Sequence, residues 1–238
     1  MKRRSQKQTE LPFRQWGGRR PGAGRKPNGD KPMVTHLARP RLSGREPLHV
    51  TLRTVPAVKK LRTKARFRTI KCALAEGKNR FGFRLVHHSV QHGHIHLIVE
   101  ANDRRALSRG MQGLSIRIAR AVNRAIGRKG SVFADRYHAR VLATPRETRN
   151  AIAYVLNNAR HHAWERAEIL PPTFLDPFSS AAAFNGWRAR APAPRVDDAV
   201  VPPRTWLLCI GWRRRGLIDV DYIPGARLGE HASPRRKR

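Results

Sequence analysis

Acidic residues are scarce in this chain of 238 residues: 16 Asp and Glu stand against 50 Lys and Arg, which gives a formal net charge of +34. An excess of one sign repels itself in a compact fold unless a polyanion neutralises it. Nucleic acid is the most obvious polyanion, because its phosphates attract Lys and Arg whatever the base sequence. The charge therefore predicts a nucleic-acid partner, although it would also suit an anionic membrane surface.

Cysteines and long apolar runs are also lacking. Cys72 and Cys209 are the only cysteines, so the sequence excludes a disulfide framework and a cysteine-rich metal cluster and favours a reducing compartment. No segment approaches the roughly 20 apolar residues that span a bilayer, and the N-terminus lacks the apolar core of a signal peptide. We therefore expect a cytoplasmic, nucleoid-associated protein with no membrane partner.

Residues 1–45 are basic, rich in Gly and Pro, and poor in periodic apolar residues, which predicts a disordered arm. Within this arm, residues 19–27 resemble an AT-hook, whose Gly-Arg-Pro core lies in the minor groove of A/T-rich DNA. The match departs from that core by one residue that stands between Arg and Pro. Predicted DNA contacts in the arm are Arg19, Arg20, Arg25 and Lys26. A generic basic tail is the alternative.

A folded domain is predicted over residues 46–165. Alternating apolar and β-branched residues predict strands over 47–55, 81–90, 94–101 and 137–143. Apolar residues at three- and four-residue spacing predict helices over 56–78, over 103–127, and from Thr144 to His162. This β-α-β-β-α-β-α order predicts an α+β, ferredoxin-like antiparallel sheet with helices on one face. Residues 166–238 read as a Pro/Ala-rich linker and a basic C-terminal extension.

The third strand carries a histidine, one apolar residue and a second histidine. Side chains alternate along a strand, so His94 and His96 point to the same face, roughly 7 Å apart. Two imidazoles in that arrangement can bind one metal ion if a third ligand comes from elsewhere. A pair of this kind taken alone is more often an ordinary surface or core pair, so the third ligand decides the interpretation.

The last helix supplies candidates for that ligand and for a nucleophile. Its start is a capping box, with Thr144 at the N-cap and Glu147 at N3. Tyr154 and Asn158 are four residues apart, which places them on one face of a single helix. A phenol can attack phosphorus and form a covalent intermediate. Imidazoles with an amide oxygen suit Mg²⁺ or Mn²⁺, although imidazole also suits Zn²⁺. A packing tyrosine and a surface asparagine are the plainer alternatives.

Taken together, these motifs resemble the single-tyrosine transposases of the HUH endonuclease superfamily, and among them most closely the REP-associated tyrosine transposases. The resemblance covers about residues 47–162 and rests on four segments in order: 88–100 with the histidine pair, 110–114 in the long helix, 132–137, and 153–160 with the tyrosine. The commoner family form often has Asn where this chain has Gly93, which puts the fine positioning of the pair in doubt.

The resemblance implies a ferredoxin-like nuclease domain that acts as a homodimer on single-stranded or hairpin DNA. It implies that His94, His96 and Asn158 hold Mg²⁺ or Mn²⁺, and that Tyr154 attacks the DNA to give a 5′-phosphotyrosine intermediate. Further residues predicted to contact DNA are Arg136, Arg140 and Arg160. His161 and His162 end the last helix, where their positive charge would suit the helix dipole.

Other functions stay open at this point. A host-adopted relative would keep the fold and process or bind chromosomal repeats without mobility. A metal-free two-histidine RNA phosphoesterase would use His49-Val50-Thr51 and His87-His88-Ser89 on neighbouring strands, but it leaves Tyr154 idle. A purely structural RNA-binding protein would need exposed aromatics among its basic residues, and aromatics are only 7% of the chain.

Overall fold

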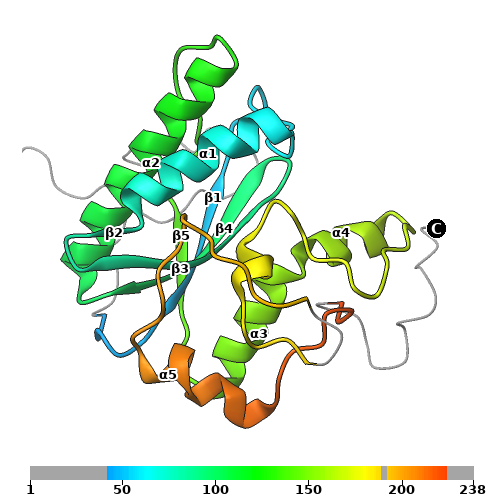
Figure 1. Cartoon of the computed structure of the whole chain (residues 1–238). Helices are drawn as coiled ribbons and strands as arrows, with labels where there is room; N and C mark the ends of the chain where they lie inside the picture. Colours follow the sequence, from blue (N-terminus) through cyan, green and yellow to red (C-terminus); the bar gives the residue numbers. More distant parts are fainter. Residues whose placement is uncertain (1–41, 189–191, 224–238) are drawn as a thin grey trace, which may run out of the picture. The chain divides into compact units, whose positions relative to one another are not determined.

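A five-stranded antiparallel sheet forms the centre of the part of the chain that the structure, a computed structural model, describes: residues 42–188 and 192–223. The strand order is β2-β3-β4-β1-β5 (Figure 1). The strands are β1 (Leu48–Arg53), β2 (Asn79–Arg80), β3 (Phe83–Val90), β4 (His94–Ala101) and β5 (His138–Val141). The predicted ferredoxin-like, α+β fold is confirmed, and the short edge strand β2 was not predicted.

Helices cover both faces of this sheet, so the expectation of helices on one face was wrong. Figure 1 shows α1 (Lys64–Gly77) and α2 (Arg104–Ala125) on one side and α3 (Pro145–Leu156) on the other. The reason lies in β4, where Ile95, Leu97 and Val99 join the core under α1 and α2, whereas Ile98 joins a second core under α3. A strand that is apolar on both sides needs cover on both sides.

Local sequence signals set where the helices begin. The side chains of Thr63, Asp103 and Thr144 cap α1, α2 and α3 by accepting hydrogen bonds from backbone N–H groups two or three residues into each helix. The capping box at Thr144 and Glu147 is present as expected. The first helix begins later than predicted, because residues 56–62 form an irregular segment whose Val58 and Leu61 are buried.

The predicted last helix is two helices. α3 ends at Leu156, Asn157 adopts φ −100° and ψ 16°, and α4 (Asn158–Glu165) follows. The Asn157 side chain donates hydrogen bonds to the carbonyl oxygens of Asp219 (3.2 Å) and Tyr222 (3.0 Å). Asparagine is a weak helix former because its amide competes for backbone groups. The C-terminal segment supplies those groups here, so it holds the break between the two helices.

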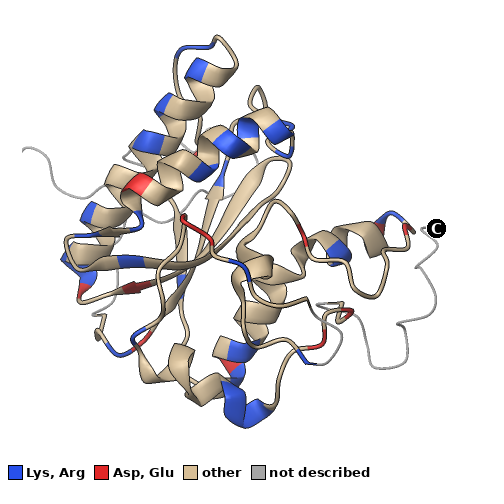
Figure 2. Cartoon of the chain, in the orientation of Figure 1, with Lys and Arg blue, Asp and Glu red and all other residues tan. Residues whose placement is uncertain are grey.

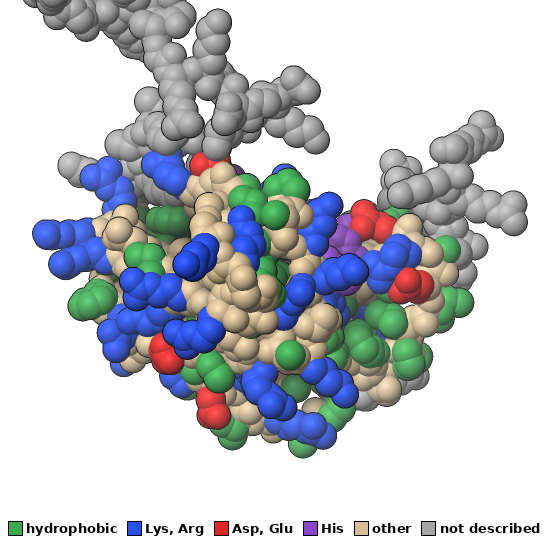
Figure 3. All heavy atoms as spheres, turned by 90° about the horizontal axis from the view of Figure 1, so that it is seen from above, with side chains coloured by type: hydrophobic (Ala, Val, Ile, Leu, Met, Phe, Trp, Pro, Cys, Tyr) green, Lys and Arg blue, Asp and Glu red, His purple; other side chains and the backbone are tan. Residues whose placement is uncertain are grey.

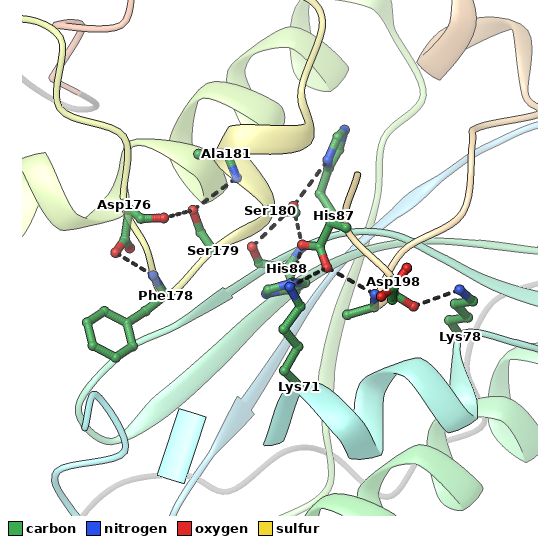
Figure 4. Close-up of polar contacts among 12 residues, drawn as sticks. Lys71, Lys78, His87, His88, Asp176, Phe178, Ser179, Ser180, Ala181 and Asp198 are labelled. Atoms are coloured by element: carbon green, nitrogen blue, oxygen red, sulfur yellow. Dashed lines mark hydrogen bonds and ion pairs between the residues drawn. The ribbon is translucent and has the colours of Figure 1, made fainter. Parts of the chain in front are cut away.

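Residues 173–188 and 192–199 pack against β3 through buried polar contacts, although the sequence predicts a linker. Figure 4 shows Ser180, whose hydroxyl accepts the N–H of His88 at 3.0 Å. Asp197 lies 3.2 Å from Nε2 of His88 and 3.1 Å from Nζ of Lys71. Burial alone would raise the pKa of Asp197, but its hydrogen bond to His88 holds that pKa below its usual range. These contacts make the segment part of the fold.

Of the remaining C-terminal elements, η1 (Ser180–Ala183) contacts β3, whereas α5 (Trp206–Cys209) and η2 (Gly211–Arg215) contact α3. Trp212 in η2 is 1% exposed and belongs to the core under α3. Glu100 at the end of β4 accepts the backbone N–H groups of Arg204 and Thr205, which ties this segment to the sheet. No helix among residues 42–188 and 192–223 is long and apolar enough to cross a membrane.

The close contact between Gly110 of α2 and Phe83 of β3 predicts the effect of a substitution on the free energy of unfolding. A Cβ atom on Gly110 would overlap the ring of Phe83, whose side chain is fully buried. Gly110→Ala should therefore lower the free energy of unfolding by about 1–3 kcal/mol, as overpacked cores do. Gly113→Ala on the same helix is the matched control, because its Cβ would meet only the flexible Arg117 side chain at 3.1 Å.

Urea unfolding of both variants measures how much stability depends on this contact. Gly113→Ala should leave stability unchanged or raise it by up to about 1 kcal/mol, because alanine favours a helix more than glycine does. Equal stability of the two alanine variants would contradict the close approach of α2 to Phe83.

Candidate active site

The two histidines of β4 lie side by side on the face that α3 covers. The ring centroids of His94 and His96 are 4.6 Å apart. His96 is 4% exposed, whereas His94 is half-buried at the start of the strand. Ile95 and Leu97 point to the opposite core, so the expected alternation is confirmed.

Strand β1 adds two polar side chains to this face. Thr51 pairs with His96 in the β-sheet register. Nδ1 of His96 lies 3.1 Å from Nε2 of His49 and 3.2 Å from Oγ1 of Thr51. Read from the sequence alone, these two residues suit only the two-histidine phosphoesterase. The pairing of β1 with β4 places His49 and Thr51 beside His96. The sequence of a single strand does not reveal which residues of another strand it pairs with.

Tyr154 lies over the histidines. Its ring centroid is 5.2 Å from that of His96 and 5.8 Å from that of His49, both in edge-to-face orientation. The residue comes from the middle of α3, whose apolar side packs on the sheet through Ile152 and Val155. The predicted nucleophile and the predicted histidine pair therefore share one site.

Asn158 is the first residue of α4, and it is 0% exposed. Neither its amide oxygen nor its amide nitrogen has a hydrogen-bond partner, and the same holds for Nε2 of His96. Buried polar atoms without partners are rare, and each calls for an explanation. An imidazole nitrogen and an amide oxygen are both groups that bind metal ions, so the donor types fit the predicted metal.

This set differs from a cluster of ionisable ligands. Among the described residues, no group of three or more His, Cys, Asp or Glu side chains is placed to hold a metal ion. Two imidazoles and one amide would leave several positions of a six-coordinate ion for substrate oxygens. The identity of the ion stays a prediction.

Two histidines of α4 extend the site. The ring of His162 is 5.9 Å from that of His94, and the ring of His161 is 6.4 Å from that of Tyr154. Both also face Glu165, at 2.8 Å and 3.6 Å respectively. From the sequence, the only role expected of His161 and His162 was a favourable interaction with the dipole at the helix end. In Figure 3, histidine side chains gather at the surface with Lys, Arg and acidic side chains beside them.

The central imidazoles are neutral at pH 7. Burial lowers the pKa of His49 to about 4, and nearby His138 and Arg140 add to the effect. Burial also lowers the pKa of His94 to about 4, helped by His162. The pKa of His96 falls for the same reason. Neutral imidazoles keep a free lone pair, which both metal binding and proton acceptance require.

The predicted DNA contacts have different outcomes. Arg160 is buried, and its guanidinium donates hydrogen bonds to the carbonyl oxygens of Pro171, Pro172 and Phe174. Its assignment to DNA is therefore wrong, because the group that would bind phosphate is used inside the fold. Arg140 is exposed and pairs with Glu147 at 3.0 Å. Arg136 is exposed before β5. Both stay predictions, and Arg19, Arg20, Arg25 and Lys26 lie outside the described residues.

Comparison with known proteins supports the resemblance. Residues 48–158 match the family model described as "Transposase IS200 like", which confirms the family inferred from the motifs. No curated protein matches the chain. A solved REP-associated tyrosine transposase bound to a REP hairpin is 16% identical, with a TM-score of 0.47 over 62% of this chain and 82% of that one.

Two further solved structures are similar to part of the chain. One, from Deinococcus radiodurans, is described as a transposase, and it is 16% identical with a TM-score of 0.35 over 46% of this chain and 85% of that one. The other is a bacterial tRNA(His) guanylyltransferase-like protein in complex with ATP, 14% identical with a TM-score of 0.37 over 55% and 66%.

The buried histidines predict how stability depends on pH. Burial also lowers the pKa of His87, to about 3, away from Tyr154. Below pH 6.5 these histidines bind protons in the unfolded chain but not in the folded one, where their pKa values are lower. The free energy of unfolding should therefore fall from pH 7 to pH 5. Urea unfolding at pH 7, 6 and 5 measures this slope, which should be shallower in His87→Phe. A flat profile would contradict the buried, neutral imidazoles.

Proposed function

Because residues 48–158 are an IS200-like transposase domain, we propose that the protein cleaves and rejoins single-stranded DNA through a covalent bond between Tyr154 and a 5′-phosphate. The single observation that carries this proposal is the position of the phenol, whose ring lies 5.2 Å from His96 and 5.8 Å from His49. A tyrosine can form a covalent intermediate when an adjacent base or a metal ion activates its phenol, and the imidazoles beside Tyr154 fit that requirement.

The reaction would proceed as a transfer between two oxygens. Oη of Tyr154 loses its proton, forms a bond to phosphorus, and displaces the 3′-oxygen of the preceding nucleotide. That oxygen takes up a proton and leaves as a 3′-hydroxyl. The imidazole of His161, whose ring centroid lies 6.4 Å from that of Tyr154, can accept and return these protons. Attack by a 3′-hydroxyl on the phosphotyrosine reverses the sequence, so rejoining consumes no ATP.

His94, His96 and Asn158 would hold a divalent cation in this site. The unpartnered Nε2 of His96 and the unpartnered amide of Asn158 support this assignment. Mixed imidazole and oxygen ligands with open positions suit Mg²⁺ or Mn²⁺. Such an ion would polarise a phosphate oxygen and stabilise the charge that develops in the transition state.

The charge of the chain favours DNA as the substrate. Lys and Arg residues recur along α1 and α2, and acidic residues are few there (Figure 2). We propose hairpin or single-stranded DNA as the partner, with binding that weakens steeply as salt rises. Assembly as a homodimer stays a prediction. A host-adopted enzyme would have the same site, since mobility depends on the flanking DNA.

The two-histidine phosphoesterase has no observation in its favour. Strand β4 lies between β1 and β3 in the sheet, so the strands that carry His49 and His87 are not neighbours. His87 contacts Ser180 and Phe184, whereas His49 contacts His96 and Tyr154.

The nucleophile predicts a covalent adduct. Incubation of the full chain and Mn²⁺ with an end-labelled library of single-stranded hairpin oligonucleotides should give a labelled band that survives denaturation. Tyr154→Phe should abolish that band and leave DNA binding unchanged, because only the phenol oxygen is removed. Tyr222→Phe is the matched control, since this tyrosine is also partly buried against the second core. An adduct on the Tyr154→Phe protein would refute the assignment.

The metal ligands predict a second pair of variants. His94→Ala should lower the rate of cleavage at least 100-fold, and EDTA should abolish cleavage by the parent protein. His92→Ala, an exposed histidine two residues away, should cleave at the parent rate. Full activity of the parent in EDTA, together with loss of activity in His94→Ala, would show that the histidines act without a metal.

A further inference from the structure

We propose that His49 is a positioning residue: it accepts a hydrogen bond from Nδ1–H of His96 and so holds Nε2 of His96 unprotonated and aimed into the site. The proposal rests on the metal-binding role given to His96 above. It extends that role to a residue on another strand, which the motif around His94 and His96 does not include.

The contact is built into the sheet. His49 and Thr51 are alternate residues of β1, and they point to the same face as His96 on the adjacent strand. The His49 ring centroid lies 5.1 Å from that of His96, with a tilt of 38° between the rings. Nε2 of His49 is 3.1 Å from Nδ1 of His96, within hydrogen-bond distance. Paired strands hold both backbones, so the ring of His96 has little freedom to turn.

One proton must lie between these two nitrogens. Two bare imidazole nitrogens repel each other, and two N–H groups cannot bond. If His49 donated the proton, His96 would carry its own proton on Nε2. That N–H would be buried without an acceptor, since Nε2 has no partner among the described residues. If His96 donates instead, Nε2 keeps a lone pair for a ligand. A metal-binding histidine ordinarily donates its other N–H to a neighbour that fixes the ring.

The surroundings of His49 suit an acceptor. His49 is half-buried in β1 and pairs with Arg140 of β5 in the sheet register. Tyr154 from α3 covers the ring edge to face. Thr51 offers a second acceptor to the same proton at 3.2 Å, but an imidazole nitrogen is the stronger base. His49 would touch neither the DNA nor the metal, and it would act only through His96.

Mn²⁺ affinity and the tautomer of His96 test the proposal in the full-length chain. Isothermal titration with MnCl₂ at pH 7.5 should show binding 10–100-fold weaker for His49→Ala than for the parent. His49→Gln, whose side-chain oxygen can accept the same hydrogen bond, should recover most of the affinity. His138→Ala is the control, because this exposed histidine of β5 pairs with Thr51 in the sheet register and has no hydrogen bond to His96. It should bind like the parent.

Nitrogen-15 spectra of the histidine side chains, assigned with a His96→Ala variant, give a readout that does not depend on metal. In the parent, His96 should be protonated on Nδ1 before Mn²⁺ is added, and that signal should change in His49→Ala. His96 protonated on Nε2, or equal affinity in His49→Ala and the parent, would overturn the proposal. A parent that binds no Mn²⁺ but has the Nδ1–H form would refute the metal site and leave the hydrogen bond to His49 standing.

Discussion

Strand β4 is the central strand of the sheet and has buried neighbours on both faces, and the rest of the structure depends on that position. One face of β4 is apolar and joins the core under α1 and α2. The other face carries His94, His96 and Ile98, so it must pack against α3 and also present imidazoles. Both tasks are compatible because side chains alternate strictly along a strand. A shift of the register by one residue would exchange the two faces and remove the site.

Burial also resolves an apparent conflict in the charge of the protein. A chain of +34 repels further protons, and its central imidazoles lie under a helix where a charged ring is costly. Both effects favour the neutral ring. The imidazoles of the site therefore keep their lone pairs, while exposed Lys and Arg side chains carry the positive charge. The positive surface attracts phosphate, and the lone pairs of the neutral imidazoles are available to the proposed reaction. Each property would be harder to obtain in a chain of balanced charge.

Local patterns predicted much of this, and long-range contacts supplied the rest. The element order, the shared face of His94 and His96, and the cap at Thr144 follow from periodicities of two or four residues. The break at Asn157 depends on carbonyl groups more than sixty residues away, and no window of sequence contains that contact. The error at Arg160 has the same origin, since only the fold brings the carbonyls of residues 171–174 to its guanidinium.

The break between α3 and α4 has a consequence for what counts as one domain. The family match ends at residue 158, yet the backbone at residues 219 and 222 holds the side chain of residue 157, next to that boundary. The unit that is recognisable by sequence and the unit that folds therefore end at different places. A fragment cut at the edge of the match would contain His94, His96, Tyr154 and Asn158 but lack the carbonyl groups that hold the break after the helix bearing Tyr154. Transfer of the motif to another protein would have to bring its distant support with it.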